Sequence, residues 1–131
     1  YLIEKNYFTF VISNQSGVGR GFYQTKDVIN LHQKMNNDFR SNFGHIDEFV
    51  FATYYKFSKK KKFRLGKNMR KPNTGMIKYL LNKWDIDLKK SLIIGDKNVD
   101  KQLAARAGIK FLYVKKEVDL IKNIKSCLKL T

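Results

Sequence analysis

Cysteine, proline and acidic residues are all scarce in this chain of 131 residues. The single cysteine, Cys127, cannot form a disulfide within the chain and cannot build a cysteine-based zinc site. No apolar run approaches the roughly 20 residues that a membrane-spanning helix needs. The sequence therefore predicts a cytoplasmic protein with no membrane partner, in which Cys127 is a small apolar residue of the last helix.

Basic residues far outnumber acidic ones, with 27 Lys and Arg against 11 Asp and Glu, and the net charge is +16. A surface of this kind attracts nucleic-acid phosphates. However, the lysines are spread along the chain, with one dense run at 59–62, and no nucleic-acid-binding motif is present. We therefore expect no specific nucleic-acid partner. A basic pocket for a small phosphorylated ligand would use the same electrostatic field.

Hydrophobic residues make up 43% of the chain, which is typical of a folded protein, and the length predicts one domain over residues 1–131. Residues 1–6 have the pattern of a helix end. Apolar runs predict strands at 7–12, within 46–55 (centred on 49–52), at 91–94 and at 109–114. Amphipathic patterns predict helices at 25–40, 75–84, 97–107 and 118–130. This alternation indicates βαβ units and an α/β fold with a parallel sheet, whose strands all end at one edge.

Two of the predicted helices carry an apolar face that we expect to meet the core. These faces consist of Val28, Leu31, Met35 and Phe39 in one helix, and Met76, Leu80, Leu81 and Trp84 in the other. Thr74 is a candidate N-cap for the second helix. Between the helices, residues 56–68 form a basic, solvated segment without periodicity, which we expect to be mobile at Gly66.

Polar residues and glycines follow the first predicted strand at once. Residues 13–22 form the predicted loop and begin with Ser13, Asn14, Gln15 and Ser16. In open α/β sheets this edge binds ligands, and glycine-rich turns offer backbone N–H groups to an anion. An ordinary connection from strand to helix is the alternative, and Asn14 could equally bond its own backbone.

Two further motifs carry charged residues, one just before a predicted helix and one at the end of a predicted strand. Residues 70–76, Arg-Lys-Pro-Asn-Thr-Gly-Met, set two cations just before a helix. Residues 92–100 form a short apolar strand that ends in Gly95 and Asp96. A carboxylate at the end of such a strand suits a hard divalent ion such as Mg²⁺.

In this order the three motifs resemble the haloacid dehalogenase (HAD) superfamily of phosphohydrolases, and most closely its histidinol-phosphate and heptose-bisphosphate phosphatase group. The resemblance runs from about residue 7 to residue 114. It implies a three-layer Rossmann-like fold. It also implies a Mg²⁺-dependent phosphatase acting on a small phosphorylated sugar, such as D-glycero-D-manno-heptose 1,7-bisphosphate, in the synthesis of bacterial surface-polysaccharide precursors.

The resemblance also assigns roles to individual residues. Ser13 and Lys71 are the catalytic candidates, since they bind the transferring phosphoryl group, and Asp96 is the metal ligand. The substrate-binding candidates are Ser13, Asn14, Gln15, Ser16, Arg70, Lys71 and Lys97. Asp100 either orients the site beside the metal or only favours the amino end of its helix electrostatically. His32 and His45 are expected to have no part in the chemistry.

The family's nucleophile is the first aspartate of an Asp-x-Asp-Gly motif, which forms an aspartyl phosphate, and no such motif precedes Ser13. The one Asp-x-Asp, at Asp85 and Asp87, lacks the following glycine and lies at the wrong end of a strand. We expect it to cap and solvate a loop. We therefore expect that the chain begins after the nucleophile strand, with the amino-terminal strand of the fold missing, and that it catalyses nothing as printed.

The zinc loop of some heptose-bisphosphate phosphatases is also absent, because residues 54–69 contain no Cys or His, so we expect Mg²⁺ and no zinc. This leaves three functions open: a sugar-phosphate phosphatase, a polynucleotide 3′-phosphatase-like enzyme that shares similar motifs, and a catalytically dead phosphate-binding module. The helix after Asp96 matches the sugar-phosphatase pattern and favours the first. We expect a monomer.

Overall fold

The structure is a computed structural model that describes residues 1–42, 44–114 and 119–130. It divides into two compact units, Tyr1–Arg70 and Lys71–Thr131, and each is described by itself. Whether residues 1–131 behave as a single domain stays a prediction. In the described residues, no helix combines the length and apolarity needed to cross a membrane.

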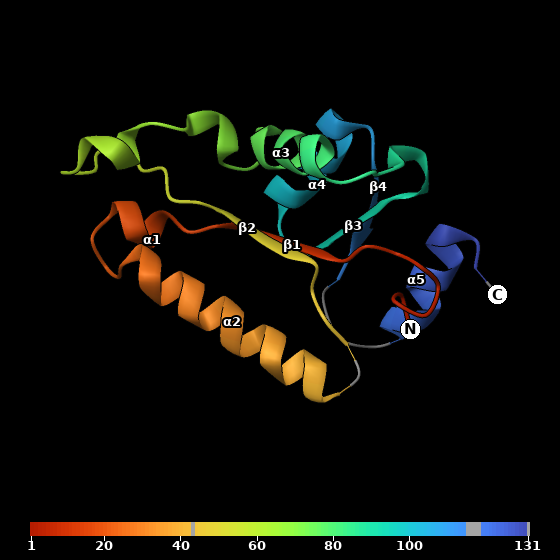
Figure 1. Ribbon diagram of the computed structural model, residues 1–131. Coiled ribbons are helices and arrows are strands. Elements are labelled where there is room, and N and C mark those ends of the chain that lie inside the picture. Colours follow the sequence, from red (N-terminus) through yellow and green to blue (C-terminus); the bar gives the residue numbers. More distant parts are fainter. Residues whose placement is uncertain (43, 115–118, 131) are drawn as a thin grey trace. The chain divides into compact units, whose positions relative to one another are not determined.

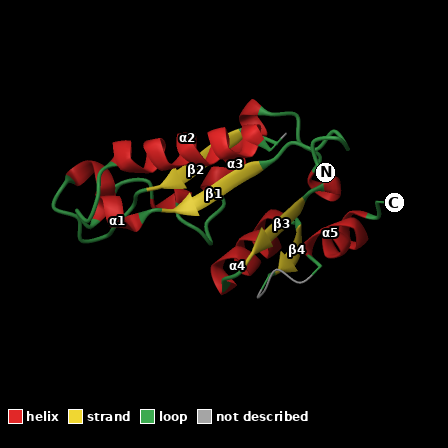
Figure 2. Ribbon diagram, turned by 90° about the horizontal axis from the view of Figure 1, so that it is seen from below, coloured by secondary structure: helices red, strands yellow, loops and turns green. Residues whose placement is uncertain are grey.

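The first unit contains a pair of parallel strands and the helices that follow them (Figures 1 and 2). Its elements are β1 (Phe10–Asn14), α1 (Ser16–Gly19), α2 (Thr25–Ser41), β2 (Glu48–Ala52) and the 3₁₀ turns η1 (Lys61–Arg64) and η2 (Lys67–Met69). In the parallel ladder Phe10 pairs with Glu48 and Ser13 with Phe51.

The second unit repeats the arrangement with another parallel pair. Its elements are α3 (Gly75–Lys83), the 3₁₀ turn η3 (Leu88–Lys90), β3 (Leu92–Gly95), α4 (Asn98–Ala107), β4 (Lys110–Tyr113) and α5 (Leu120–Leu128). Leu92 pairs with Lys110 and Gly95 with Tyr113. Helix α4 packs on both strands and α5 on β4. Gly108, with φ of +70°, ends α4 in the left-handed conformation that glycine adopts without strain.

The alternation of strands and helices and the parallel pairing confirm the predicted α/β class. Several boundaries were wrong at the amino end. Residues 1–6 form hydrogen-bonded turns and no helix, and β1 begins at Phe10 and includes Ser13 and Asn14. The ladder reaches this far because the Gln15 N–H donates to the Ala52 carbonyl at 2.7 Å. The predicted loop at 13–22 contains the short helix α1.

The predicted core face of α2 is correct only in part. Val28 is buried as predicted, whereas Leu31 and Phe39 are 52% and 42% exposed and His32 is buried instead. The His32 ring stacks on Phe49 of β2 with 4.4 Å between the centroids. The Phe49 ring thus provides a buried surface for the polar His32 ring. A count of apolar residues would place His32 at the surface. Burial lowers the pKa of His32 below its ordinary value of 6.5.

This buried histidine predicts a loss of stability in mild acid. Well above pH 6.5 the ring is neutral in both the folded and unfolded states. As the pH falls below that value, the unfolded chain takes up a proton that the folded protein binds less readily, so the free energy of unfolding decreases. Urea unfolding between pH 5 and 7.5 should show this slope. A His32→Leu variant should have a smaller slope, and an unchanged slope would contradict the assignment.

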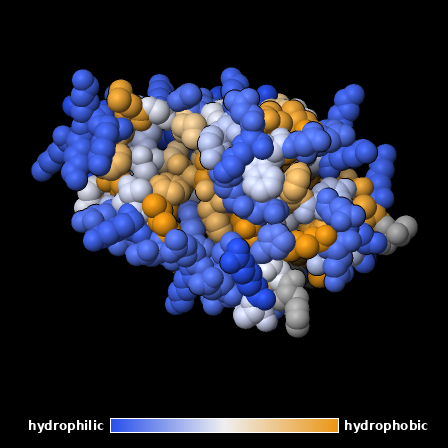
Figure 3. All heavy atoms as spheres, in the orientation of Figure 1, coloured by the Kyte–Doolittle hydropathy of each residue, from blue (hydrophilic) through white to orange (hydrophobic). Residues whose placement is uncertain are grey.

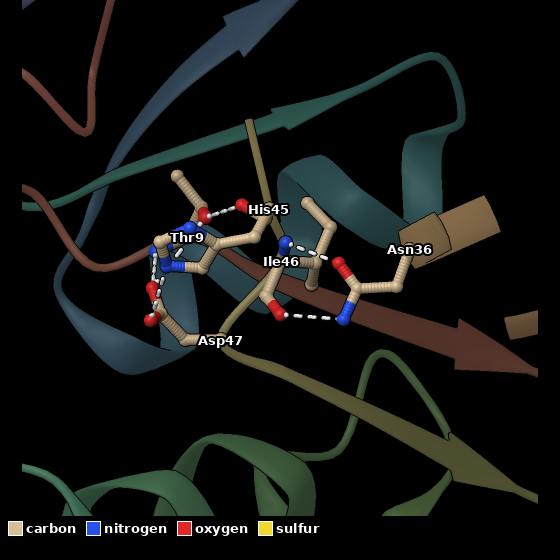
Figure 4. Close-up of polar contacts among 5 residues, drawn as sticks. All are labelled: Thr9, Asn36, His45, Ile46 and Asp47. Carbon is tan, nitrogen blue, oxygen red and sulfur yellow. Dashed lines mark hydrogen bonds and ion pairs between the residues drawn. The ribbon is translucent and has the colours of Figure 1, made fainter. Parts of the chain in front are cut away.

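A polar cluster joins the segments that precede β1 and β2 (Figure 4). The Asp47 carboxylate accepts the Thr9 N–H at 2.7 Å and lies 3.1 Å from His45 Nε2. The Asn36 side chain of α2 accepts from the Ile46 N–H at 2.8 Å and donates to its carbonyl at 3.2 Å. These bonds fix the starts of both strands and the end of α2 together. His45 therefore has a structural partner at the end of the sheet opposite Ser13.

Helix α3 buries Met76, Ile77 and Leu80, of which Met76 is completely inaccessible. Leu81 is 36% exposed, so its predicted core position was wrong, and Ile77 is buried in addition. Thr74 occupies the N-cap position, but its side chain makes no capping hydrogen bond. The predicted last helix is present as α5 and contains Cys127, and its predicted start at Val118 lies outside the described residues.

Residues 56–67 lie in the segment predicted to lack periodicity, but they contain defined hydrogen bonds and the 3₁₀ turn η1. The Tyr55 N–H donates to the Phe63 carbonyl at 2.8 Å, and the buried Ser58 hydroxyl accepts from the Lys60 N–H at 3.3 Å. Gly66 turns the chain with φ of +78°. The Lys and Arg residues of this segment are exposed. Figure 3 shows the part of the first unit that contains the segment, at the left, as largely hydrophilic.

Candidate active site

The carboxyl end of β1 carries the first set of predicted site residues. Ser13 and Asn14 are the last two residues of the strand, and α1 begins at Ser16. Ser13 to Ser16 are all half-buried. The ladder bond from Gln15 N–H to Ala52 holds this end of the strand against β2, so Ser13 sits on regular structure.

A chain of hydrogen bonds links three side chains at this end. The Tyr23 hydroxyl donates to Gln15 Oε1 at 2.6 Å, and Gln15 Nε2 donates to Ser13 Oγ at 2.8 Å. Sequence reasoning identified Ser13 and Gln15 but missed Tyr23. No local signal marks Tyr23, because its contact depends on the fold of the turn that brings it back.

Two glycines of the motif are required by close packing. A Cβ at Gly17 would lie 2.3 Å from the Tyr23 ring, and a Cβ at Gly19 would lie 2.6 Å from the Thr53 carbonyl oxygen. Neither position has room for a side chain, because real Cβ atoms do not approach so closely. The glycines thus let α1 pack on Tyr23 and on the segment after β2.

Arg70 ends the first unit with an unsatisfied donor. Its Nη1 atom is buried and has no hydrogen-bond partner among the described residues. A buried charged donor without a partner costs several kcal/mol or needs an anion. This observation favours the predicted role of Arg70 in binding an anionic substrate, which stays a prediction.

In the second unit, the strand β3 ends at Gly95 and is followed by Asp96 and Lys97. Both side chains are exposed. Across residues 1–42, 44–114 and 119–130, the Asp96 carboxylate forms no hydrogen bond or ion pair. It is therefore a charged acceptor at the end of a parallel strand with its oxygens available.

Asp100 is bound from two sides. Its Oδ1 lies 2.7 Å from Lys71 Nζ, and its Oδ2 accepts the Lys97 N–H at 3.2 Å. The carboxylate packs against Gly95, where an added Cβ would lie 2.5 Å from Asp100 Cβ. Asp100 thus accepts a hydrogen bond at the amino end of α4 and also pairs with Lys71, and its role in orienting the site beside the metal stays a prediction. The pairing with Lys71 was not predicted.

The described residues contain no group of three or more His, Cys, Asp or Glu that could hold a metal ion. Mg²⁺ usually binds through one or two carboxylates and keeps several waters, and Asp96 fits one such ligand. In the Asp85–Asp87 motif, Asp87 has the expected structural role, since its carboxylate accepts the Lys89 N–H at 2.9 Å and caps η3.

The structure therefore assembles two sets of the predicted residues, one in each unit. The first set contains Ser13, Asn14, Gln15 and Ser16, with Arg70 in the same unit, and the second contains Lys71, Asp96, Lys97 and Asp100. The roles assigned to these residues stay predictions. In the first unit, the structure fixes the Ser13 hydroxyl. In the second unit, it fixes the Lys71 ammonium and leaves the Asp96 carboxylate available.

Comparison with known proteins places these features in a family. The HAD-hydrolase-like family matches residues 68–126. A heptose-1,7-bisphosphate 7-phosphatase of Rhodopseudomonas palustris is 36% identical over 103 residues, which is 79% of this chain and 57% of that protein. A D-glycero-alpha-D-manno-heptose-1,7-bisphosphate 7-phosphatase of Campylobacter jejuni is 31% identical over 130 residues, covering 96% of this chain and 70% of that protein.

A solved structure has a similar fold. The D,D-heptose 1,7-bisphosphate phosphatase from B. bronchiseptica, complexed with magnesium and phosphate, is 26% identical and superposes with a TM-score of 0.76 over 98% of this chain and 65% of that one. The fold and its motifs are those of a HAD phosphohydrolase. The chain belongs to the heptose-bisphosphate phosphatase-like group of the HAD superfamily. It spans little more than half the length of the first two curated relatives, 57% and 54%.

Proposed function

We propose that the full-length protein carrying this chain is a Mg²⁺-dependent phosphatase that removes one phosphate from a small sugar phosphate of the heptose 1,7-bisphosphate type. The observation that carries the proposal is the Lys71–Asp100 pair, 2.7 Å apart and largely buried, in the unit whose strand β3 is followed by the available carboxylate of Asp96. A fixed ammonium suits the charge that develops on a transferring phosphoryl group.

In this proposal the chain's residues bind and orient the phosphoryl group. Lys71, held by Asp100, faces its negative charge as a compact cation. Ser13 donates its hydroxyl hydrogen to an equatorial oxygen, and Arg70 offers its unpaired Nη1–H to another oxygen of the substrate. Asn14, Gln15, Ser16 and Lys97 supply further polar contacts. The attack itself belongs to the aspartate motif of the family, which this chain does not contain.

The proposal assigns one ligand of Mg²⁺ to Asp96. When bound, the ion would neutralise charge on the phosphoryl oxygens. The solved relative that contains magnesium supports the use of this ion.

An Asp96→Asn substitution should raise the Mg²⁺ concentration needed for half-maximal phosphate release by at least about tenfold, a loss that even outer-shell partners of metals show. Asp85→Asn is the matched control, because Asp85 is also exposed and unpaired in the described part of the chain. Titration of Mg²⁺ into metal-free protein with a phosphate-release assay makes the measurement. Equal Mg²⁺ requirements for wild type and Asp96→Asn would remove Asp96 from the site.

A 3′-phosphorylated polynucleotide is the second candidate substrate. No Asp or Glu occurs between Glu48 and Asp85, and residues 56–67 present exposed cations on an ordered segment. Such a surface would attract a nucleic-acid backbone. The seven cations are Lys56, Lys59, Lys60, Lys61, Lys62, Arg64 and Lys67.

Phosphate release from the two substrate classes separates the candidates. The sugar proposal predicts faster release from heptose 1,7-bisphosphate than from 3′-phosphorylated DNA, with little effect of salt on the sugar reaction. A preference for the DNA that falls steeply as salt rises would support the second candidate instead. Release from neither substrate would reject both.

A further inference from the structure

Tyr23 determines how the Gln15 side-chain amide is oriented. The Tyr23 hydroxyl donates to Gln15 Oε1 at 2.6 Å, a short bond that places the amide oxygen on the tyrosine side. Because the amide is planar, its nitrogen then points to the other side, where Nε2 donates to Ser13 Oγ at 2.8 Å. The bond from Tyr23 thus sets the amide orientation that the bond to Ser13 requires.

This amide orientation leaves the hydroxyl hydrogen of Ser13 free of the bond to Gln15. A serine hydroxyl can donate one hydrogen bond and accept two. Since Ser13 Oγ accepts from Gln15, its own hydrogen is not used in that bond. Within the described residues Ser13 makes no other side-chain hydrogen bond. The hydrogen is therefore left to donate to a ligand at the carboxyl end of β1.

The position of Tyr23 is itself enforced by packing. Gly17 lies so close to the ring that a Cβ there would approach Tyr23 Cζ to 2.5 Å and the hydroxyl oxygen to 2.6 Å. The missing side chain at Gly17 therefore makes room for the tyrosine hydroxyl just where it meets Gln15. Ser13, Gln15 and Gly17 of the loop motif and Tyr23 just after it are therefore connected by direct contacts.

We propose that Tyr23 is a positioning residue for the phosphoryl site: through Gln15 it directs the Ser13 hydroxyl hydrogen toward a phosphoryl oxygen of the substrate. The inference rests on the proposed function, since it assigns a purpose to that hydrogen. If Tyr23 lost its hydroxyl, the Gln15 amide could turn over. Its oxygen would then accept the Ser13 hydrogen and withdraw it from the substrate.

The test is a double-mutant cycle in the full-length protein, with steady-state kinetics on heptose 1,7-bisphosphate. Tyr23→Phe should lower kcat by about fivefold to tenfold, the worth of one hydrogen bond, and should change KM little. In a Ser13→Ala background the same Tyr23→Phe change should alter kcat by less than about twofold, because the hydrogen it directs is gone. Tyr7→Phe is the control, since the Tyr7 hydroxyl makes no hydrogen bond in the described residues.

The outcomes separate a positioning role from a structural one. A structural role for Tyr23 would lower activity by the same factor with or without the Ser13 hydroxyl, and such additivity would overturn the inference. So would an unchanged kcat in Tyr23→Phe. If the wild-type protein releases no phosphate from any sugar phosphate, the proposed function fails instead. The inference that rests on this function then fails with it.

Discussion

Replacement of Lys71 by alanine should reduce phosphate release by about 10²–10³-fold, the loss seen when a fixed electrostatic group is removed from a reacting oxygen. Its Nζ atom lies 2.7 Å from Asp100 Oδ1, and the side chain is only 13% exposed. The ammonium therefore acts from a fixed position and with little solvent screening. Initial rates at saturating Mg²⁺ measure the effect.

Lys78→Ala is the matched control for this prediction. Lys78 lies seven residues further on, in α3, and is exposed. Removing its charge changes the net charge by the same amount as Lys71→Ala but touches no site residue, so its rate should stay within about twofold of wild type. Circular dichroism of each variant shows whether it is folded. A folded Lys71→Ala variant with more than half of the wild-type rate would refute the role of Lys71.

Loss of one partner of the Lys71–Asp100 pair should also cost stability. A Lys71→Met variant should lose about 3–5 kcal/mol in the free energy of unfolding, because the Asp100 carboxylate stays buried without its cation. Asp100 is 7% exposed. Replacing both partners, as Lys71→Met with Asp100→Asn, should recover most of this loss, because no buried charge is left unpaired.

Urea unfolding of the single and double variants gives the comparison, with Lys89→Met as the control for an exposed lysine. In the double variant the side-chain amide introduced by Asp100→Asn can still accept the Lys97 N–H through its carbonyl oxygen, so the cap of α4 is retained. Additive losses in the double variant would show that the two side chains act independently. That result would contradict the coupling inferred from their distance.

Sequence reasoning succeeded where the signal is local or repeated along the chain. Gly108 marks the end of α4 through its left-handed backbone, and the apolar runs mark the four strands found in the described residues. The three ordered motifs gave the family, which the relatives confirm. These signals depend on residues that lie close together in the sequence, so they can be recognised without knowing the fold.

The remaining features depend on contacts between distant residues. Lys71 and Asp100 are 29 positions apart, and nothing in either motif states that they pair. The hydrophobic pattern of α2 favours Leu31, but the core contact is made by His32, because Phe49 offers a ring on which it stacks. Ring stacking across elements is invisible to a count of apolar residues.

The candidate site was predicted at the level of residues but not of geometry. Ser13, Lys71 and Asp96 were singled out by motif, and their roles stay predictions. The bonds that prepare them came only from the structure, through Tyr23 for Ser13 and through Asp100 for Lys71. In both cases the motif names the group that we expect to meet the ligand, and the fold supplies the group that orients it.

The most direct test of this account is ³¹P NMR of heptose 1,7-bisphosphate incubated with the full-length protein. With Mg²⁺ present, the signal of one ester phosphate should disappear while inorganic phosphate appears, and the other ester signal should persist. Omission of Mg²⁺ or substitution of Lys71 by alanine should leave both ester signals in place. Two unchanged ester signals in the presence of wild-type protein and Mg²⁺ would contradict the proposed activity.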